Sequence, residues 1–125
     1  MLGLLKRFED FEVYKRAYRI SLEIHNVTLK FPRYEQYGMG DQMRRASKSI
    51  CSNFAEGFAK QSFSKLEFKK YLFIGIGSAN EMIVWSSYSK DLGYISIEVC
   101  DRWKKEYDEI ARILQGVYRS LEIKD

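Results

Sequence analysis

The side chains best suited to nucleophilic catalysis or to binding a transition metal are one histidine, His25, and two cysteines, Cys51 and Cys100. The cysteines are far apart and form no Cys-x-x-Cys or Cys/His cluster, so the usual zinc-ligand spacings are missing. No Glu-x-x-His sequence exists, which argues against a di-iron site in a helix bundle. His25 falls among aromatic positions, where a structural histidine is more common than a catalytic one. We therefore expect no catalytic residue, no metal and no cofactor.

Polar side chains also form a stripe along the segment Asp41–Gly57. At about 100° per residue, an apolar stripe and a polar stripe run side by side on this segment. The apolar stripe contains Met39, Met43, Ala46, Ile50 and Phe54, and the polar stripe contains Gln42, Arg45, Ser49, Asn53 (or Ser52) and Glu56. Because a buried polar group needs a hydrogen-bond partner, the polar stripe is either a structural seam or a binding site.

Glu81 is the ionised residue between Lys70 and Lys90, in an otherwise apolar segment. Unpaired charge is costly to bury, so Glu81 should have a partner. An antiparallel helical hairpin that turns near Gln61 would place Arg45 within one turn of it. We therefore predict a buried Arg45–Glu81 ion pair as part of the seam, and an exposed Arg44.

Basic residues gather around the turn expected after residue 59, with Phe58 and Phe63 nearby. Basic groups interleaved with aromatic rings suit nucleic acid, and the net charge of +4 favours polyanions mildly. The candidate nucleic-acid contacts are Arg44, Lys48, Lys60, Lys65, Lys69 and Lys70. Alternatively these charges form an ordinary solvated face, and the protein is a protein–protein interaction scaffold with no nucleic-acid role.

Four helices are expected to carry these residues, over about residues 10–30, 39–59, 64–91 and 96–122. Asp10, Ser64 and Ser96 are the expected N-caps, Pro32 ends the first helix, and Gly93 is a C-cap glycine. Short loops between helices of similar length predict an all-α, antiparallel up-down-up-down four-helix bundle. The chain reads as a single domain (1–125) with residues 1–9 as an N-terminal tail.

The first and third helices carry more apolar surface than one bundle face requires. The first helix has a second stripe that includes Tyr14, Tyr18 and Leu22, which is typical of a subunit interface, so we expect a homo-oligomer. The third helix is apolar almost all round and should be the most buried. Its low-charge stretch is interrupted by polar residues, so we expect no membrane span and a cytoplasmic protein.

The segment Asp41-Gln-x-Arg-Arg-Ala-x-x-Ser-Ile-x-Ser-Asn-x-Ala-Glu-Gly57 resembles the signature of the proteins encoded in intervening sequences of bacterial 23S ribosomal RNA genes. Phe31-Pro32, Tyr37-Gly38 and Leu92-Gly93-Tyr94-Ile95 agree with it. The resemblance covers about residues 8–95, and Gly75-Ile76 departs from a usual Ala-Arg.

This resemblance implies an antiparallel four-helix bundle that assembles as a homopentamer and has no known enzymatic activity. Relatives in the same superfamily assist retroelement reverse transcriptases through a basic surface. RNA or DNA is therefore the partner that the resemblance suggests.

Overall fold

The computed structural model describes residues 7–121 and consists mainly of four helices. They are α1 (Glu12–Thr28), α2 (Met39–Lys60), α3 (Lys65–Asp91) and α4 (Ile97–Ser120), with short 3-10 helices η2 (Phe8–Asp10) and η3 (Arg33–Glu35). No strand occurs within residues 7–121, so the predicted all-α four-helix fold is confirmed. Most of the predicted tail (1–9) and the predicted end of the last helix at Glu122 lie outside the described residues.

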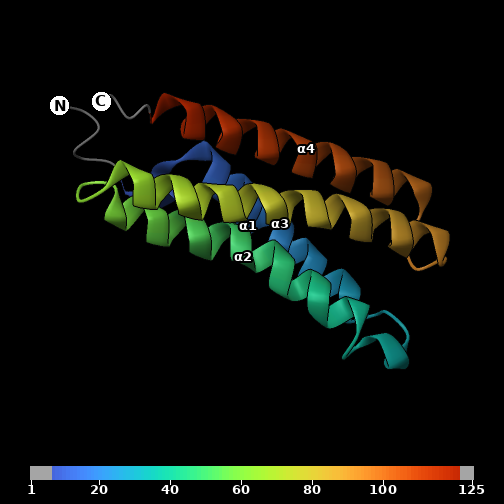
Figure 1. Cartoon of the computed structure of the whole chain (residues 1–125). Coiled ribbons are helices and arrows are strands. Elements are labelled where there is room, and N and C mark those ends of the chain that lie inside the picture. The colour runs from blue at the N-terminus through green and yellow to red at the C-terminus, as the bar shows by residue number, and fades with distance from the viewer. Residues whose placement is uncertain (1–6, 122–125) are drawn as a thin grey trace.

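Each helix runs back alongside the one before it (Figure 1). The start of α1, the α2–α3 turn and the end of α4 therefore lie at one end of the bundle, which we call the turn end. The α1–α2 and α3–α4 connections lie at the other. The interfaces of α3 with α2 and α4 are extensive, whereas α1 and α4 meet over a thin contact.

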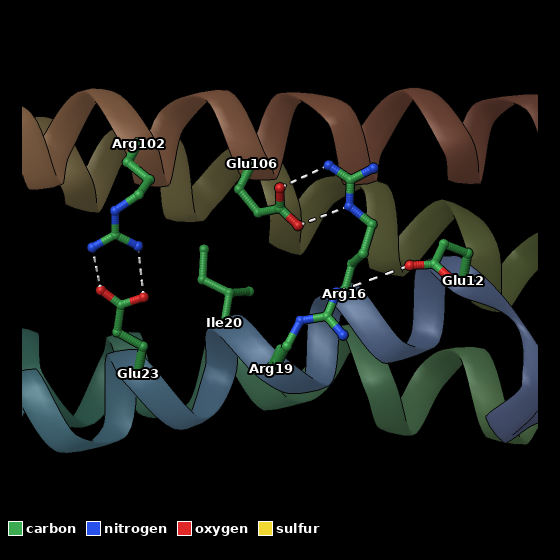
Figure 2. A pocket seen from close by; sticks show the side chains of 7 residues that line it. All are labelled: Glu12, Arg16, Arg19, Ile20, Glu23, Arg102 and Glu106. Carbon is green, nitrogen blue, oxygen red and sulfur yellow. Dashed lines mark hydrogen bonds and ion pairs between the residues drawn. The ribbon is translucent and has the colours of Figure 1, made fainter.

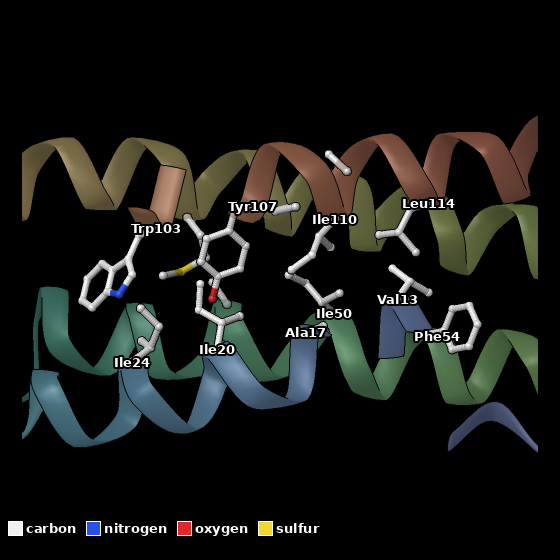
Figure 3. Close-up of a cluster of buried hydrophobic side chains, with 14 of the residues drawn as sticks. Val13, Ala17, Ile20, Ile24, Ile50, Phe54, Trp103, Tyr107, Ile110 and Leu114 are labelled. Carbon is white, nitrogen blue, oxygen red and sulfur yellow. The ribbon is translucent and has the colours of Figure 1, made fainter. Parts of the chain in front are cut away.

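The core lies along the inner faces of the helices, and on α2 it follows the apolar stripe predicted from the sequence (Figure 3). The large α4 side chains Trp103, Tyr107, Ile110 and Leu114 are all at most 1% exposed. They face Ala17, Ile20 and Ile24 of α1 and Ile50 and Phe54 of α2. Burial of this apolar surface is the main force that holds four amphipathic helices together.

Three of the predicted helix ends are confirmed by their geometry. Ser64 Oγ accepts a hydrogen bond from the Glu67 backbone N–H at 3.2 Å, and Ser96 Oγ accepts one from Val99 at 3.2 Å. Gly93 has a φ of 81°, the left-handed conformation that a C-cap glycine supplies.

The predicted N-cap of the first helix is wrong. Asp10 Oδ2 accepts a hydrogen bond from the Arg7 backbone N–H at 2.9 Å and so closes the η2 turn, while Phe11 occupies the N-cap position of α1. A short acidic residue can close a 3-10 turn as readily as it can cap a helix.

Helix α3 was predicted from its composition to be the most buried helix, but one of its sides is exposed to solvent. It packs against α2 and α4, and its third side faces outward. The apolar side chains exposed there are Leu66, Phe73, Ile74, Val84 and Tyr88, each about half exposed or more. Hydrophobic periodicity reports which residues are apolar, but it does not report how many neighbours a helix has.

Candidate nucleic-acid interface

Four of the predicted basic residues meet at the turn end of the bundle, where α2 finishes and α3 begins. Lys60, Lys65 and Lys70 are exposed and Lys69 is half-buried. Lys60 Nζ lies 5.8 Å from the centre of the Tyr71 ring, and Lys70 Nζ lies 3.3 Å from a carboxylate oxygen of Glu67. Exposed lysine side chains with weak local partners can turn toward phosphate groups.

Arg119 joins this cluster from the last turn of α4, and the sequence interpretation missed it. The Nζ atom of Lys69 lies 4.5 Å from the centre of the Tyr118 ring, which fixes the end of α4 beside the start of α3. Arg119 follows Tyr118 directly and is exposed. The sequence did contain a signal for this contact, because a hairpin of α3 and α4 that turns at Gly93 places Lys69 level with Tyr118. Phe63, at the tip of the α2–α3 turn, is 89% exposed.

Lys48 does not belong to this cluster. It lies in the middle of α2, and its Nζ atom is 2.9 Å from Nδ1 of His25 on α1. The structure therefore places it on the α1–α2 side of the bundle, away from the turn end.

Arg44 was predicted to be exposed, and this is wrong. Its Nη1 atom donates to Thr28 Oγ1 at 2.9 Å, and its Nη2 atom donates to the Gln36 carbonyl oxygen at 2.7 Å. The half-buried guanidinium thus joins α2 to the end of α1 and to the following loop. Its two terminal nitrogens therefore both donate hydrogen bonds inside the molecule.

The predicted Arg45–Glu81 pair is also wrong. Arg45 has a 74% exposed side chain, and its Nε atom donates to Asp41 Oδ2 at 2.8 Å. Glu81 Oε2 accepts hydrogen bonds from Gln42 Nε2 at 2.8 Å and from Trp85 Nε1 at 2.9 Å. Gln42 lies level with Glu81 in the same hairpin register, so an amide and an indole satisfy the carboxylate instead of a guanidinium.

The other members of the polar stripe are divided between the α2–α3 contact and the surface. The hydroxyls of Ser49 and Ser78 are 2.7 Å apart, and Asn53 Nδ2 donates to the Ser49 carbonyl oxygen at 2.8 Å. Glu56 is exposed. Small polar groups therefore join α2 and α3 at Gln42 and Ser49, while Arg45 and Glu56 face solvent.

Two bidentate ion pairs that the sequence interpretation did not predict join α1 to α4 (Figure 2). Glu106 accepts from Arg16 Nε at 2.9 Å and from Nη2 at 2.7 Å, while Glu23 accepts from Arg102 Nη1 at 2.8 Å and Nη2 at 2.6 Å. A cleft of about 510 Å³ lies between the pairs, with Ile20 among its lining residues.

These ion pairs shift the titration of both carboxyl groups. The hydrogen bonds from Arg102 hold the pKa of Glu23 below its ordinary value, and those from Arg16 do the same for Glu106. Glu23 also accepts from Nε1 of the buried Trp103 at 3.0 Å. The cleft is lined by three arginines and three glutamates, so its charges balance and it has no excess of either sign to attract an ion.

The second apolar stripe of α1 remains partly uncovered in the single chain. Tyr18 is 50% exposed and Leu22 is 47% exposed, while Tyr14 is half-buried and stacks on Tyr18 with ring centres 6.0 Å apart. Phe8 of η2 packs against Tyr14 with ring centres 5.1 Å apart, whereas Tyr18 and Leu22 stay about half exposed within residues 7–121.

Within residues 7–121, no group of three or more His, Cys, Asp or Glu side chains could hold a metal ion. No helix in the same residues has the length and apolar character needed to cross a membrane.

Fold and surface together define a small four-helix-bundle protein with a basic end. The chain belongs to the family of 23S rRNA-intervening sequence proteins, whose family model matches residues 9–116. The fold is similar to that of a protein of unknown function from the S23 ribosomal protein family of Bacteroides thetaiotaomicron. That crystal structure superimposes with a TM-score of 0.75 at 23% identity, over 86% of this chain and 95% of the other. No curated protein matches the chain.

Proposed function

We propose that this protein has no enzymatic activity and binds nucleic acid through the turn end of the bundle. The observation that supports the proposal is the cluster of Lys60, Lys65, Lys70 and Arg119, whose side chains are exposed and come from three different helices. Charge contacts of this kind act on phosphates and carry little sequence information. Arg44 is excluded from the proposed contacts because its guanidinium is occupied inside the fold.

We propose further that the protein acts as a homo-oligomer, a pentamer as the family resemblance implies. The partly uncovered stripe of Tyr14, Tyr18 and Leu22 on α1 is the proposed contact between subunits. An oligomer would present several basic ends to one nucleic acid, and linked weak sites bind far more tightly than a single site does.

Binding of a labelled structured RNA across a salt series tests the proposal. Log affinity should fall linearly with log salt concentration, because phosphate contacts release counterions. The double variant Lys65→Gln/Lys70→Gln should bind more weakly and show a slope smaller by about two. Lys30→Gln removes an exposed lysine at the other end of the bundle and is the matched control.

Two results would contradict the proposal. One is the absence of salt-dependent binding to RNA or DNA, and the other is an equal loss in the Lys30→Gln control. The first result would favour the second candidate, a protein-interaction scaffold, which the exposed apolar side of α3 supports. The second would remove the turn end as the specific binding surface.

A further inference from the structure

A shallow cavity of about 300 Å³ opens between α3 and α4 near the turn end of the bundle. Its lining residues are Phe73, Ile76, Gln115, Tyr118 and Arg119. The volume lies at the lower end of the range for small-molecule sites, roughly 300–1,000 Å³. We call this cavity the α3–α4 slot.

The slot combines apolar and polar groups in an arrangement that suits a flat aromatic ring. Phe73 presents an aromatic ring that is 68% exposed, and Ile76 adds an aliphatic wall. Gln115 carries an amide that can both donate and accept a hydrogen bond. Heterocyclic bases need such a surface, since they stack on aromatic rings and form hydrogen bonds at their edges.

The charge beside the slot is positive. Arg119 is one of its lining residues, and Lys69 holds its ammonium group 4.5 Å from the centre of the Tyr118 ring. Among residues 7–121, no aspartate or glutamate lines the slot. An occupant should therefore be an anion that carries a planar ring, which is the chemistry of a nucleotide.

We propose that the α3–α4 slot takes one unpaired base of a single-stranded nucleic acid, with Lys69 and Arg119 on the neighbouring phosphates. The base would stack on Phe73 and form hydrogen bonds with the Gln115 amide. This inference rests on the proposed nucleic-acid function and adds to it a preference for single strands, because a base inside a duplex is stacked on both faces and paired at one edge.

Fluorescence anisotropy tests this inference by measuring the affinity for three labelled ligands. They are an oligouridylate, a strand of the same length without bases, and the matching duplex. The wild-type protein should prefer the intact single strand to the abasic strand by about tenfold, the effect of one stacked base. Phe73→Leu keeps an apolar side chain and removes the aromatic ring, so this preference should disappear while the salt slope stays the same. Tyr88→Leu is the matched control, since Tyr88 is a 54% exposed aromatic residue of α3 that does not line the slot.

The outcomes separate the two proposals. Equal wild-type affinity for intact and abasic strands, or an equal effect of Phe73→Leu and Tyr88→Leu, would overturn the base slot and leave the phosphate-binding function standing. Tighter binding of the duplex than of the single strand would also overturn the base slot and leave the phosphate-binding function standing. Failure of every strand to bind would overturn the proposed function together with the slot. Circular dichroism and light scattering of both variants establish that helicity and assembly are unchanged.

Discussion

Arg44 of α2 donates a 2.9 Å hydrogen bond from Nη1 to Oγ1 of Thr28, the last residue of α1. Gln36 completes this contact, because its Nε2 atom donates to the carbonyl oxygens of Thr28 at 2.9 Å and Phe31 at 3.0 Å. The final carbonyls of a helix have no partner within the helix. Arg44 and Gln36 therefore close the end of α1 and hold the α1–α2 connection against α2.

The first prediction concerns the two adjacent arginines. Arg44→Ala should lower the free energy of unfolding by about 1–3 kcal/mol, because it removes two charged hydrogen bonds, one to buried Thr28 and one to half-buried Gln36. Arg45→Ala should change it by no more than about 0.5 kcal/mol, since the exposed Arg45–Asp41 pair contributes little. Urea denaturation measures both. Equal losses at the two positions would contradict the assignment of Arg44 to the fold.

The second prediction is a dependence on pH. Arg102 and Arg16 lower the folded-state pKa of Glu23 and Glu106 from the ordinary value of 4.5. The two carboxylates therefore stabilise the fold fully above about pH 4.5, and this contribution is lost as the pH falls through their lower folded pKa values. The double variant Glu23→Gln/Glu106→Gln should lower the free energy of unfolding by about 1–3 kcal/mol at neutral pH. Its stability should also fall less steeply than that of the wild type as the pH is lowered.

Thermal unfolding between pH 7 and pH 3 measures this effect. Glu56→Gln removes an exposed carboxylate and is the control, so its profile should follow that of the wild type. If the double variant declined in acid as steeply as the wild type, the two ion pairs would not be the source of the acid sensitivity.

The third prediction compares two helical glycines. A Cβ atom at Gly57 would lie 2.7 Å from Tyr71 Cβ and 2.8 Å from Phe68 Cδ1, so α2 and α3 approach each other closely at this glycine. Gly57→Ala should destabilise the fold by about 1–3 kcal/mol through overpacking. A Cβ atom at Gly77 would meet no neighbouring side chain within 4 Å among the described residues, so Gly77→Ala should stabilise the protein by up to about 1 kcal/mol. Melting temperatures that rise in both variants would contradict the close approach at Gly57.

The fourth prediction concerns assembly. Light scattering should give a mass several times the 14.8 kDa of one chain. Tyr18→Glu should reduce that mass and leave the helical circular dichroism signal unchanged, because a charge in an apolar interface opposes association and Tyr18 is half exposed in the single chain. Lys105→Glu places the same charge on the exposed side of α4 and should not change the mass. A wild-type mass near that of one chain would reject self-association.

The sequence by itself determined the helices and their inner faces. The spacing of Met43, Ala46, Ile50 and Phe54 predicted the buried side of α2, because side chains three or four residues apart lie on one face of a helix. Ser64, Gly93 and Ser96 predicted helix ends for a similarly local reason, since a cap is a contact between residues a few positions apart. Such signals do not require knowledge of any neighbouring helix.

Only the tertiary structure decided what each outward-facing group does. Arg44 and Arg45 are adjacent in sequence and about 100° apart around α2, so the position of α1 decides which guanidinium is used inside the fold and which is exposed. The exposure of Phe73 follows from the number of helices that pack against α3. The α3–α4 slot, and the position of Arg119 beside the start of α3, depend on the register between α3 and α4. This register is set by the packing of side chains that are far apart in the chain.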